Sequence, residues 1–142
     1  MFSKTCEYAI RAMIYVANNS AEDNKKSVKD IAEGIDSPTH FIAKILQDLS
    51  RKGLIQSTKG PNGGFYMTSE NLKVTLADII ISIDGTKMYK ECILGLKACS
   101  EETPCPIHFE YKAIKKAILK MLEGNSITNF NEQNIGNIFL KQ

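Results

Sequence analysis

The segment from residue 38 to 52 is the feature of this sequence that most constrains its fold. Its apolar and polar residues recur three and four positions apart, so they fall on opposite faces of a helix. Ser37 and Pro38 form a cap-and-proline start signal, and Gly53 is a stop signal. The apolar face consists of Ile42, Ile45, Leu46 and Leu49, and the polar face of His40, Lys44, Gln47 and Arg51. The pattern predicts a helix that packs with one face and leaves the other exposed.

A second, shorter helix is predicted directly before it. Ser27 and Asp30 have the spacing of a capping box, and Gly34 lies near the expected end. About three residues separate the two helices, as in a helix-turn-helix, whose second helix enters the major groove of DNA. The alternative is a solvated face on any small helical domain. The candidate DNA contacts of the second helix are Ser37, Thr39, His40, Ala43, Lys44, Gln47 and Arg51.

Two segments with strand composition follow and flank a glycine-rich turn. Strands are predicted over 54–59 and 65–68, and Asn62-Gly63 is a strong hairpin signal. Beside the helix pair, this hairpin is expected to be a wing whose cationic stem and backbone N–H groups lie near DNA phosphates. A plain surface hairpin is the alternative, whereas a nucleotide site is excluded because the turn lacks a Gly-Lys-Ser/Thr ending and a following helix. The candidate wing contacts are Lys59, Gly60, Pro61, Asn62 and Gly63.

Charge and composition narrow the class of protein. Residues 25–60 carry seven basic and four acidic side chains, a net charge of +3, whereas the whole chain of 142 residues carries +2. This modest excess lies where DNA would bind and predicts weak, salt-dependent non-specific binding. No apolar run approaches the roughly 18 residues of a membrane span, and Lys4, Glu7 and Arg11 interrupt the first apolar stretch, so a cytoplasmic protein is expected. An enzyme is not expected, because no nucleophile–base motif or paired catalytic carboxylates appear.

The remaining pattern completes a fold that is mainly α with a small β-hairpin. Helices are predicted over 3–19, 75–84 and 105–123, and the polar tail gives no secondary-structure assignment. We therefore expect a winged helix-turn-helix DNA-binding domain over 1–85, a cysteine-containing loop over 86–104, a long dimerisation helix over 105–124 and a C-terminal tail over 125–142.

Three of the four cysteines are close together in the sequence. Cys92, Cys99 and Cys105 are separated by six and five residues, and His108 follows one helical turn later. In a reducing compartment such cysteines are typical of a metal centre or of redox thiols, and the spacing leaves an iron–sulfur cluster, zinc and a thiol switch open. The fourth, Cys6, lies on the apolar stripe of the first helix, so it is expected to be a buried core residue.

The long helix over 105–123 carries a seam typical of helix pairing. Its members alternate spacings of four and three: Ile107, Tyr111, Ile114, Ile118 and Met121. Leu119 and Leu122 lie off this seam and provide a second surface for packing on the chain's own core. The seam predicts a homodimer, and an intramolecular packing face is the alternative.

Several of these segments together resemble a known family. They are Glu7-Tyr8-Ala9-Ile10-Arg11-Ala12, Ser27-Val28-Lys29-Asp30-Ile31-Ala32, Phe41-Ile42-Ala43-Lys44-Ile45-Leu46, Lys52-Gly53-Leu54-Ile55 and Lys59-Gly60-Pro61-Asn62-Gly63-Gly64-Phe65. The chain resembles the Rrf family (type two) of bacterial winged-helix transcription regulators up to about residue 124. The resemblance implies a homodimer that binds double-stranded DNA.

The cysteines resemble those of the family's cluster-binding branch, which includes an iron–sulfur cluster regulator and a nitric-oxide-sensitive repressor. The resemblance implies that Cys92, Cys99 and Cys105 hold an iron–sulfur cluster. The fourth metal ligand is His108, by analogy with a two-iron cluster, or Glu7 of the other subunit, by analogy with a four-iron cluster. The function implied is a regulator that senses nitric oxide, redox state or iron–sulfur supply, and the alternative is a DNA-binding regulator with zinc or thiol-switch cysteines. At Ala43 the sequence departs from the iron–sulfur cluster regulator, so its DNA site does not transfer.

Overall fold

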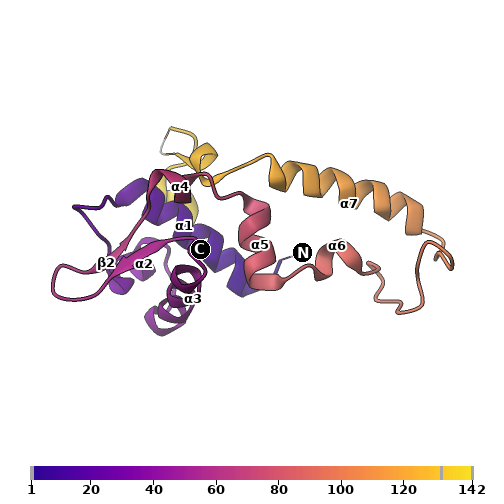
Figure 1. Ribbon diagram of the computed structural model, residues 1–142, viewed down its shortest axis with the longest axis horizontal. Helices are drawn as coiled ribbons and strands as arrows, with labels where there is room; N and C mark the ends of the chain where they lie inside the picture. Colours follow the sequence, from indigo (N-terminus) through magenta and orange to yellow (C-terminus); the bar gives the residue numbers. More distant parts are fainter. Residues whose placement is uncertain (1, 132, 142) are drawn as a thin grey trace.

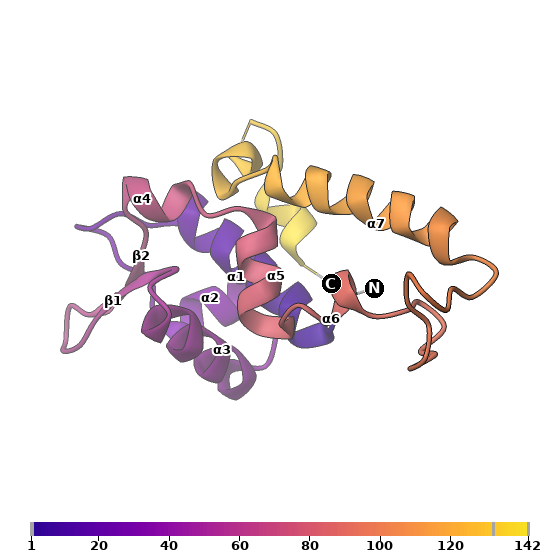
Figure 2. The same cartoon turned by 45° about the vertical axis from the view of Figure 1, so that its right-hand side comes forward.

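The computed structural model describes residues 2–131 and 133–141, which form a winged-helix body with one long projecting helix (Figure 1, Figure 2). The expected fold class, mainly helical with a small β-hairpin, is confirmed. We call residues 86–124 the arm and the other described residues the body. The elements in chain order are α1 Lys4–Asn19, α2 Val28–Gly34, α3 Thr39–Arg51, β1 Gln56–Thr58, β2 Gly64–Tyr66, α4 Ser69–Leu72, α5 Leu76–Asp84, α6 Lys87–Lys90, α7 His108–Glu123, η1 Ile127–Phe130 and η2 Asn137–Leu140.

Three helices of the body begin where the sequence predicts. At the start of α1, the side-chain oxygen of Ser3 accepts a hydrogen bond from the backbone N–H of Cys6. Capping boxes begin α2 and α5, formed by Ser27 with Asp30 and by Thr75 with Asp78. Each cap satisfies N–H groups that have no partner within the helix, which fixes where the helix starts.

The start of α3 differs from the expectation. Pro38 takes the N-cap position without a side-chain cap, so the predicted capping role of Ser37 is wrong. Ser37 instead ends the preceding turn, because its N–H donates to the carbonyl of Ala32 at 2.9 Å and its hydroxyl is buried. The turn between α2 and α3 also contains Asp36 at φ 53°, a left-handed conformation that tightens the reversal.

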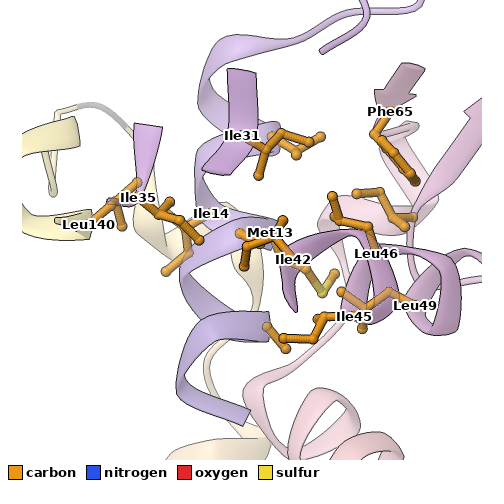
Figure 3. Packing of buried hydrophobic residues seen from close by; sticks show 14 of the residues in the cluster. Met13, Ile14, Ile31, Ile35, Ile42, Ile45, Leu46, Leu49, Phe65 and Leu140 are labelled. Atoms are coloured by element: carbon orange, nitrogen blue, oxygen red, sulfur yellow. The ribbon is translucent and has the colours of Figure 1, made fainter. Parts of the chain in front are cut away.

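A single apolar core joins the first three helices. Met13 of α1 lies beside Ile42 and Leu46 of α3, and Ile35 and Leu140 lie together at one edge of the cluster (Figure 3). All five side chains are at most 1% exposed. Burying one such side chain stabilises a fold by about 1.5–3 kcal/mol, so this cluster fixes the position of α3 in the body.

The hairpin is shorter than the sequence predicts. β1 and β2 have three residues each and pair antiparallel from Gln56 with Tyr66 to Thr58 with Gly64. Leu54 lies outside the strand because its N–H donates to the carbonyl of Leu49 and so completes the exit from α3. The loop over 59–63 is therefore the whole tip of the wing.

The base of the wing is held by a third segment. Lys26 and Phe65 exchange backbone hydrogen bonds of 2.9 and 2.8 Å. The chain passes so close there that a Cβ on Gly64 would lie 2.7 Å from the carbonyl oxygen of Lys26, and Gly64 also has φ 146°. Only glycine fits this position.

The C-terminal segment, for which the sequence gives no assignment, packs into the body. Ile127 of η1 and Leu140 of η2 are 1% exposed in the main core. Arg11 of α1 donates hydrogen bonds to the carbonyls of Ile35 at 3.0 Å and Leu140 at 2.8 Å. The guanidinium thus connects the turn before α3 with the end of the chain.

The arm has almost no core of its own. Of the described residues, none between Ile80 and Leu122 is buried. Leu122 anchors α7 to the body, with Ile118 packed partly beside it, so Ile118 of the predicted seam contacts the chain's own core. The cysteine loop lies at the far end of α7, away from the body (Figure 1, Figure 2).

The helix α7 begins at His108, three residues later than its predicted start at Cys105. The N–H of Cys105 points at the Sγ of Cys99, 3.4 Å away, and the N–H of His108 donates to the Cys105 carbonyl. The residues before α7 are thus folded toward another cysteine, which delays the first helical turn. In the part of the chain that the structure describes, no helix is long and apolar enough to cross a membrane.

Candidate metal centre and nucleic-acid interface

The polar face of α3 is open to solvent. Its exposed residues are Thr39, His40, Lys44, Gln47 and Arg51, while Ala43 is half-buried. The four apolar residues predicted for the opposite face are all buried. A rigid helix with one free polar face is the geometry that reads base edges in a major groove.

Charges at the end of α3 are partly neutralised. Arg51 and Lys52 both pair with Asp48, and the Lys52 Nζ lies 2.9 Å from the carboxylate. The hydrogen bond from Lys52 holds the pKa of Asp48 below its ordinary value. A phosphate that binds Arg51 therefore competes with Asp48, whereas Lys44 forms no ion pair with any described residue.

Ser37 precedes α3 and ends the turn after α2. Its hydroxyl oxygen is buried without a hydrogen-bond partner among the described residues, so this group does not extend the exposed polar face of α3. The periodicity placed Ser37 before the helix, but only the packed turn shows which way its side chain points.

The wing offers a cationic, side-chain-poor tip. Lys59, Gly60, Pro61 and Asn62 are exposed. Gly63 is half-buried, and its N–H donates to the Gly60 carbonyl at 2.9 Å, so that N–H is already occupied. The wing therefore presents Lys59 and the outer turn to a ligand.

Three cysteine side chains converge at the far end of α7. The sulfur atoms of Cys92, Cys99 and Cys105 all lie within 4.8 Å of one another, and those of Cys92 and Cys105 are 4.0 Å apart. We call these three residues the cysteine triad. They line a cavity of about 30 Å³. Three thiols at this separation suit metal coordination, since thiolates are ligands of both zinc and iron–sulfur centres.

The thiols of the triad differ in acidity. Backbone N–H groups of Leu96 and Leu94 point at Cys92 and lower its pKa. The N–H of Cys105 also lowers the pKa of Cys99, but burial and the neighbouring thiols outweigh it, so the net pKa of Cys99 is raised. Backbone N–H groups thus point at two of the three thiols, which favours the thiolate form there.

His108 adjoins the triad. Its Nδ1 lies 3.2 Å from the Cys99 sulfur, and its Nε2 lies 3.5 Å from a carboxylate oxygen of Glu101. Glu101 is also paired with Lys112, whose hydrogen bond lowers the pKa of that carboxyl. The Nε2 of His108 is buried without a hydrogen bond among the described residues, so a small approach by Glu101 would complete the carboxylate contact that is typical of metal-binding histidines.

Glu7 is placed elsewhere. It lies on α1, where it pairs with Lys4 at 3.1 Å, and it does not belong to the cluster of ligand atoms that the triad forms. Within one chain, the structure does not bring Glu7 together with the cysteines.

Cys6 has the environment expected of a core residue. It is fully buried beside Ala77, Ile80 and Leu122. Burial, with Asp84 and Glu7 nearby, raises its pKa to about 12. A thiol of this kind stays protonated and is a poor metal ligand or nucleophile.

These features together define a winged helix-turn-helix regulator with a cysteine centre on a projecting arm. The Rrf2 family, described as iron-dependent transcriptional regulators, matches residues 2–133, and the chain belongs to this family. The expected family is thereby confirmed, and the chain is a transcription regulator and not an enzyme.

Individual relatives agree with this membership. An HTH-type transcriptional regulator of Aquifex aeolicus is 36% identical over 129 residues, which cover 89% of this chain and 88% of that protein. The HTH-type transcriptional regulator NsrR of Geobacillus kaustophilus is 23% identical, covering 89% and 86% of the two chains.

Solved structures show the same fold. CymR, the global cysteine regulator of B. subtilis, superposes with a TM-score of 0.72 at 22% identity and covers 97% of each chain. IscR of T. potens superposes with a TM-score of 0.69 at 23% identity and covers 91% of this chain and 84% of its own.

Two charged residues beside the triad were not found from the sequence. Glu101 contacts His108, and Lys115 lines the cavity of the triad. Both stand among other charged residues on polar segments, so neither composition nor periodicity distinguishes them. Only the fold of the loop against α7 brings them to the cysteines.

Proposed function

We propose that this chain is a dimeric DNA-binding regulator in which an iron–sulfur cluster, held by Cys92, Cys99 and Cys105, controls affinity for operator DNA. The observation that carries the proposal is the convergence of three thiols within 4.8 Å on an arm without a hydrophobic core. The description of the family as iron-dependent and the relatives named IscR support iron as the metal. Because its partner is operator DNA, we place the regulator in the cytoplasm.

The proposed DNA contacts are the exposed face of α3 and the outer turn of the wing. Both surfaces are polar or cationic and belong to one rigid body, so α3 lies in a major groove while the wing follows the adjacent backbone. The residues proposed are Thr39, His40, Ala43, Lys44, Gln47, Arg51, Lys59, Gly60, Pro61, Asn62 and Gly63.

The proposed dimer interface is the exposed apolar surface of α7. Ile107, Ile114 and Met121 share one face of α7 and are 37–56% exposed, on a helix that meets the body at one end only. Contiguous exposed apolar side chains of this kind mark interaction surfaces. A second copy of α7 is the occupant that the seam spacing favours.

We propose His108 as the fourth ligand in preference to Glu7. His108 already lies against Cys99 within the same chain, whereas Glu7 would have to come from a second copy. A donor set of three thiolates and one imidazole is compatible with a two-iron cluster, some of which use histidine in place of cysteine. When bound, such a cluster supplies a redox-sensitive link between the loop and the start of α7.

Zinc is the second candidate, and the sulfur spacing favours it. Two thiolates about 2.3 Å from one zinc ion at the tetrahedral angle lie about 3.8 Å apart. The distance of 4.0 Å between Cys92 and Cys105 is close to this value, and the cavity of about 30 Å³ suits a single ion. A cluster requires the sulfurs to move outward, which the coreless loop permits.

Metal analysis of protein purified without oxygen tests the proposal. We expect iron and acid-labile sulfide in equal amounts, with a visible absorption spectrum, and loss of both in Cys92→Ala. The matched control is Cys6→Ala, which removes the buried cysteine and retains the metal. Stoichiometric zinc without sulfide, or no metal at all, contradicts the cluster.

Selection of binding sites from a random double-stranded DNA pool tests the proposed DNA contacts. We expect Lys59→Ala to weaken binding evenly across sequences and to reduce the salt slope by about 1, while Lys116→Ala on α7 leaves both unchanged. The sensing role fails if Cys99→Ala abolishes the cluster but the variant and the wild type bind the operator with equal affinity in all redox states.

A further inference from the structure

Lys115 connects α7 to the end of α6, next to the cysteine triad. Its Nζ lies 3.4 Å from the carbonyl oxygens of both Tyr89 and Glu91, which bracket the end of α6. Glu91 directly precedes Cys92 in the chain. A side chain of α7 thus binds the backbone of the segment that carries the first cysteine.

The position of Lys115 is fixed by a further contact. Its ammonium lies 5.1 Å from the ring centroid of Tyr111, one helical turn earlier on α7. Lys115 is half-buried, whereas Lys116 beside it is exposed. A partly buried charge is screened less by solvent and salt than an exposed one.

Lys115 also lines the cavity of the triad. The lining contains all three cysteines together with Lys90, His108, Tyr111 and Lys115. Three thiolates add negative charge to this cavity, and a zinc or iron centre neutralises only part of it. A cation held at the wall stabilises the remaining charge by Coulomb attraction.

The arm offers few other means of holding Cys92 near Cys105. No described residue between Ile80 and Leu122 is buried, so apolar packing does not fix the loop. The pair formed by Glu101 and Lys112 fastens the segment near Cys99, but both side chains are more than half exposed. Exposed pairs contribute little to stability.

We propose that Lys115 is the positioning residue of the metal centre: it fastens the Cys92 segment to α7 and supplies a fixed positive charge beside the thiolates. This inference rests on the proposed metal-binding function, but not on which metal is bound. Partners outside the ligand shell typically change metal affinity by about 10- to 100-fold when they are removed.

The test is titration of the reduced, metal-free protein with cobalt(II), followed through the thiolate-to-metal absorption. We expect Lys115→Met to weaken cobalt binding by about 10-fold or more. Lys115→Arg keeps the charge and the hydrogen-bond donors, so it restores most of the affinity. Lys116→Met, which removes the neighbouring exposed charge, binds as the wild type does.

A second readout separates charge from folding. Where the protein holds an iron–sulfur cluster, Lys115→Met shifts its midpoint potential to more negative values, because reduction then adds negative charge without the ammonium nearby. If Lys115 only supported the fold, the midpoint potential would not shift in Lys115→Met and return to the wild-type value in Lys115→Arg. Circular dichroism of the metal-free variants serves as the check on the fold.

The outcomes distinguish the inference from the proposed function. If the wild type binds no cobalt, the metal centre itself is wrong and the inference falls with it. If the wild type binds and Lys115→Met binds equally well, or if Lys115→Arg fails like Lys115→Met, only the inference is overturned.

Discussion

The body and the arm of this protein are stabilised by different means. In the body, buried side chains from four helices, the wing and the C-terminal segment form one core, and Arg11 ties the turn before α3 to the C-terminal segment. In the arm, the described residues between Ile80 and Leu122 include none that is buried, and the cysteine triad is held by polar contacts. Apolar packing therefore fixes the body, whereas the arm relies on polar contacts, and the metal and second copy proposed above are what would hold it further.

The largest expected difference is the response of the two regions to pH. Thiols bind metal as thiolates, so each thiol that loses a proton on binding weakens metal affinity by up to about tenfold when the pH falls by one unit. Three such thiols give a combined effect of up to about a thousandfold. The measurement is a zinc competition titration at two pH values near neutrality, and affinity independent of pH would show that the thiols are not the ligands.

The body is expected to be insensitive over the same pH range. Hydrogen bonds from Ser27 and Lys52 lower the pKa of Asp30 and Asp48. A lowered folded pKa stabilises the protein above the ordinary carboxyl pKa near 4, and this contribution is lost only as the pH falls through the lowered value. The free energy of unfolding of the metal-free protein, measured with denaturant at the same two pH values, is therefore expected to stay unchanged and serves as the internal control.

Next in size is the loss of a core side chain. Leu46→Ala leaves a cavity among α1, α2 and α3, and we expect it to lower the free energy of unfolding by about 2–5 kcal/mol with or without metal. Urea unfolding followed by circular dichroism measures this. Leu46→Met conserves most of the volume and is expected to cost less than about 1.5 kcal/mol. An equal loss in both variants would show that volume is not what matters there.

The C-terminal segment gives a smaller effect with a matched neighbour. Leu140 is 1% exposed and Phe139 is 71% exposed. We expect Leu140→Ala to lower the free energy of unfolding by about 2–3 kcal/mol, near the low end for leucine because the chain end can partly close the cavity. Phe139→Ala changes it by less than about 0.5 kcal/mol. Similar effects of the two substitutions would contradict the packing of this segment into the body.

The smallest expected effect concerns the arm alone. Ile114 is 53% exposed on α7. Ile114→Asp places a charge in the proposed dimer seam, and we expect the dimer dissociation constant to rise by at least about tenfold, which corresponds to about 1.4 kcal/mol. Sedimentation at several concentrations measures it, with Lys116→Asp as the control on another face. Unchanged association of Ile114→Asp would remove this helix from the interface.

Local signals were sufficient for the elements of the body. Ser27 with Asp30 and Thr75 with a carboxylate three residues later are capping signals that act within one turn, and Gly85 ends α5 as a glycine stop should. The two faces of α3 follow from periodicity alone. Such features depend on residues a few positions apart, which is why they are legible without a structure.

The sequence determined the winged-helix class, the polar and apolar faces of α3, the burial of Cys6 and the cysteines of the candidate centre. The tertiary structure decided that the hydroxyl of Ser37 is buried, that Leu140 completes the core, that His108 lies against Cys99, and that Lys115 reaches the segment before Cys92. The physical reason is distance along the chain. Caps and amphipathic faces arise from neighbouring residues. The contacts decided by the tertiary structure join segments that can lie far apart in the sequence, as Arg11 and Leu140 do, and they exist only once the chain is folded.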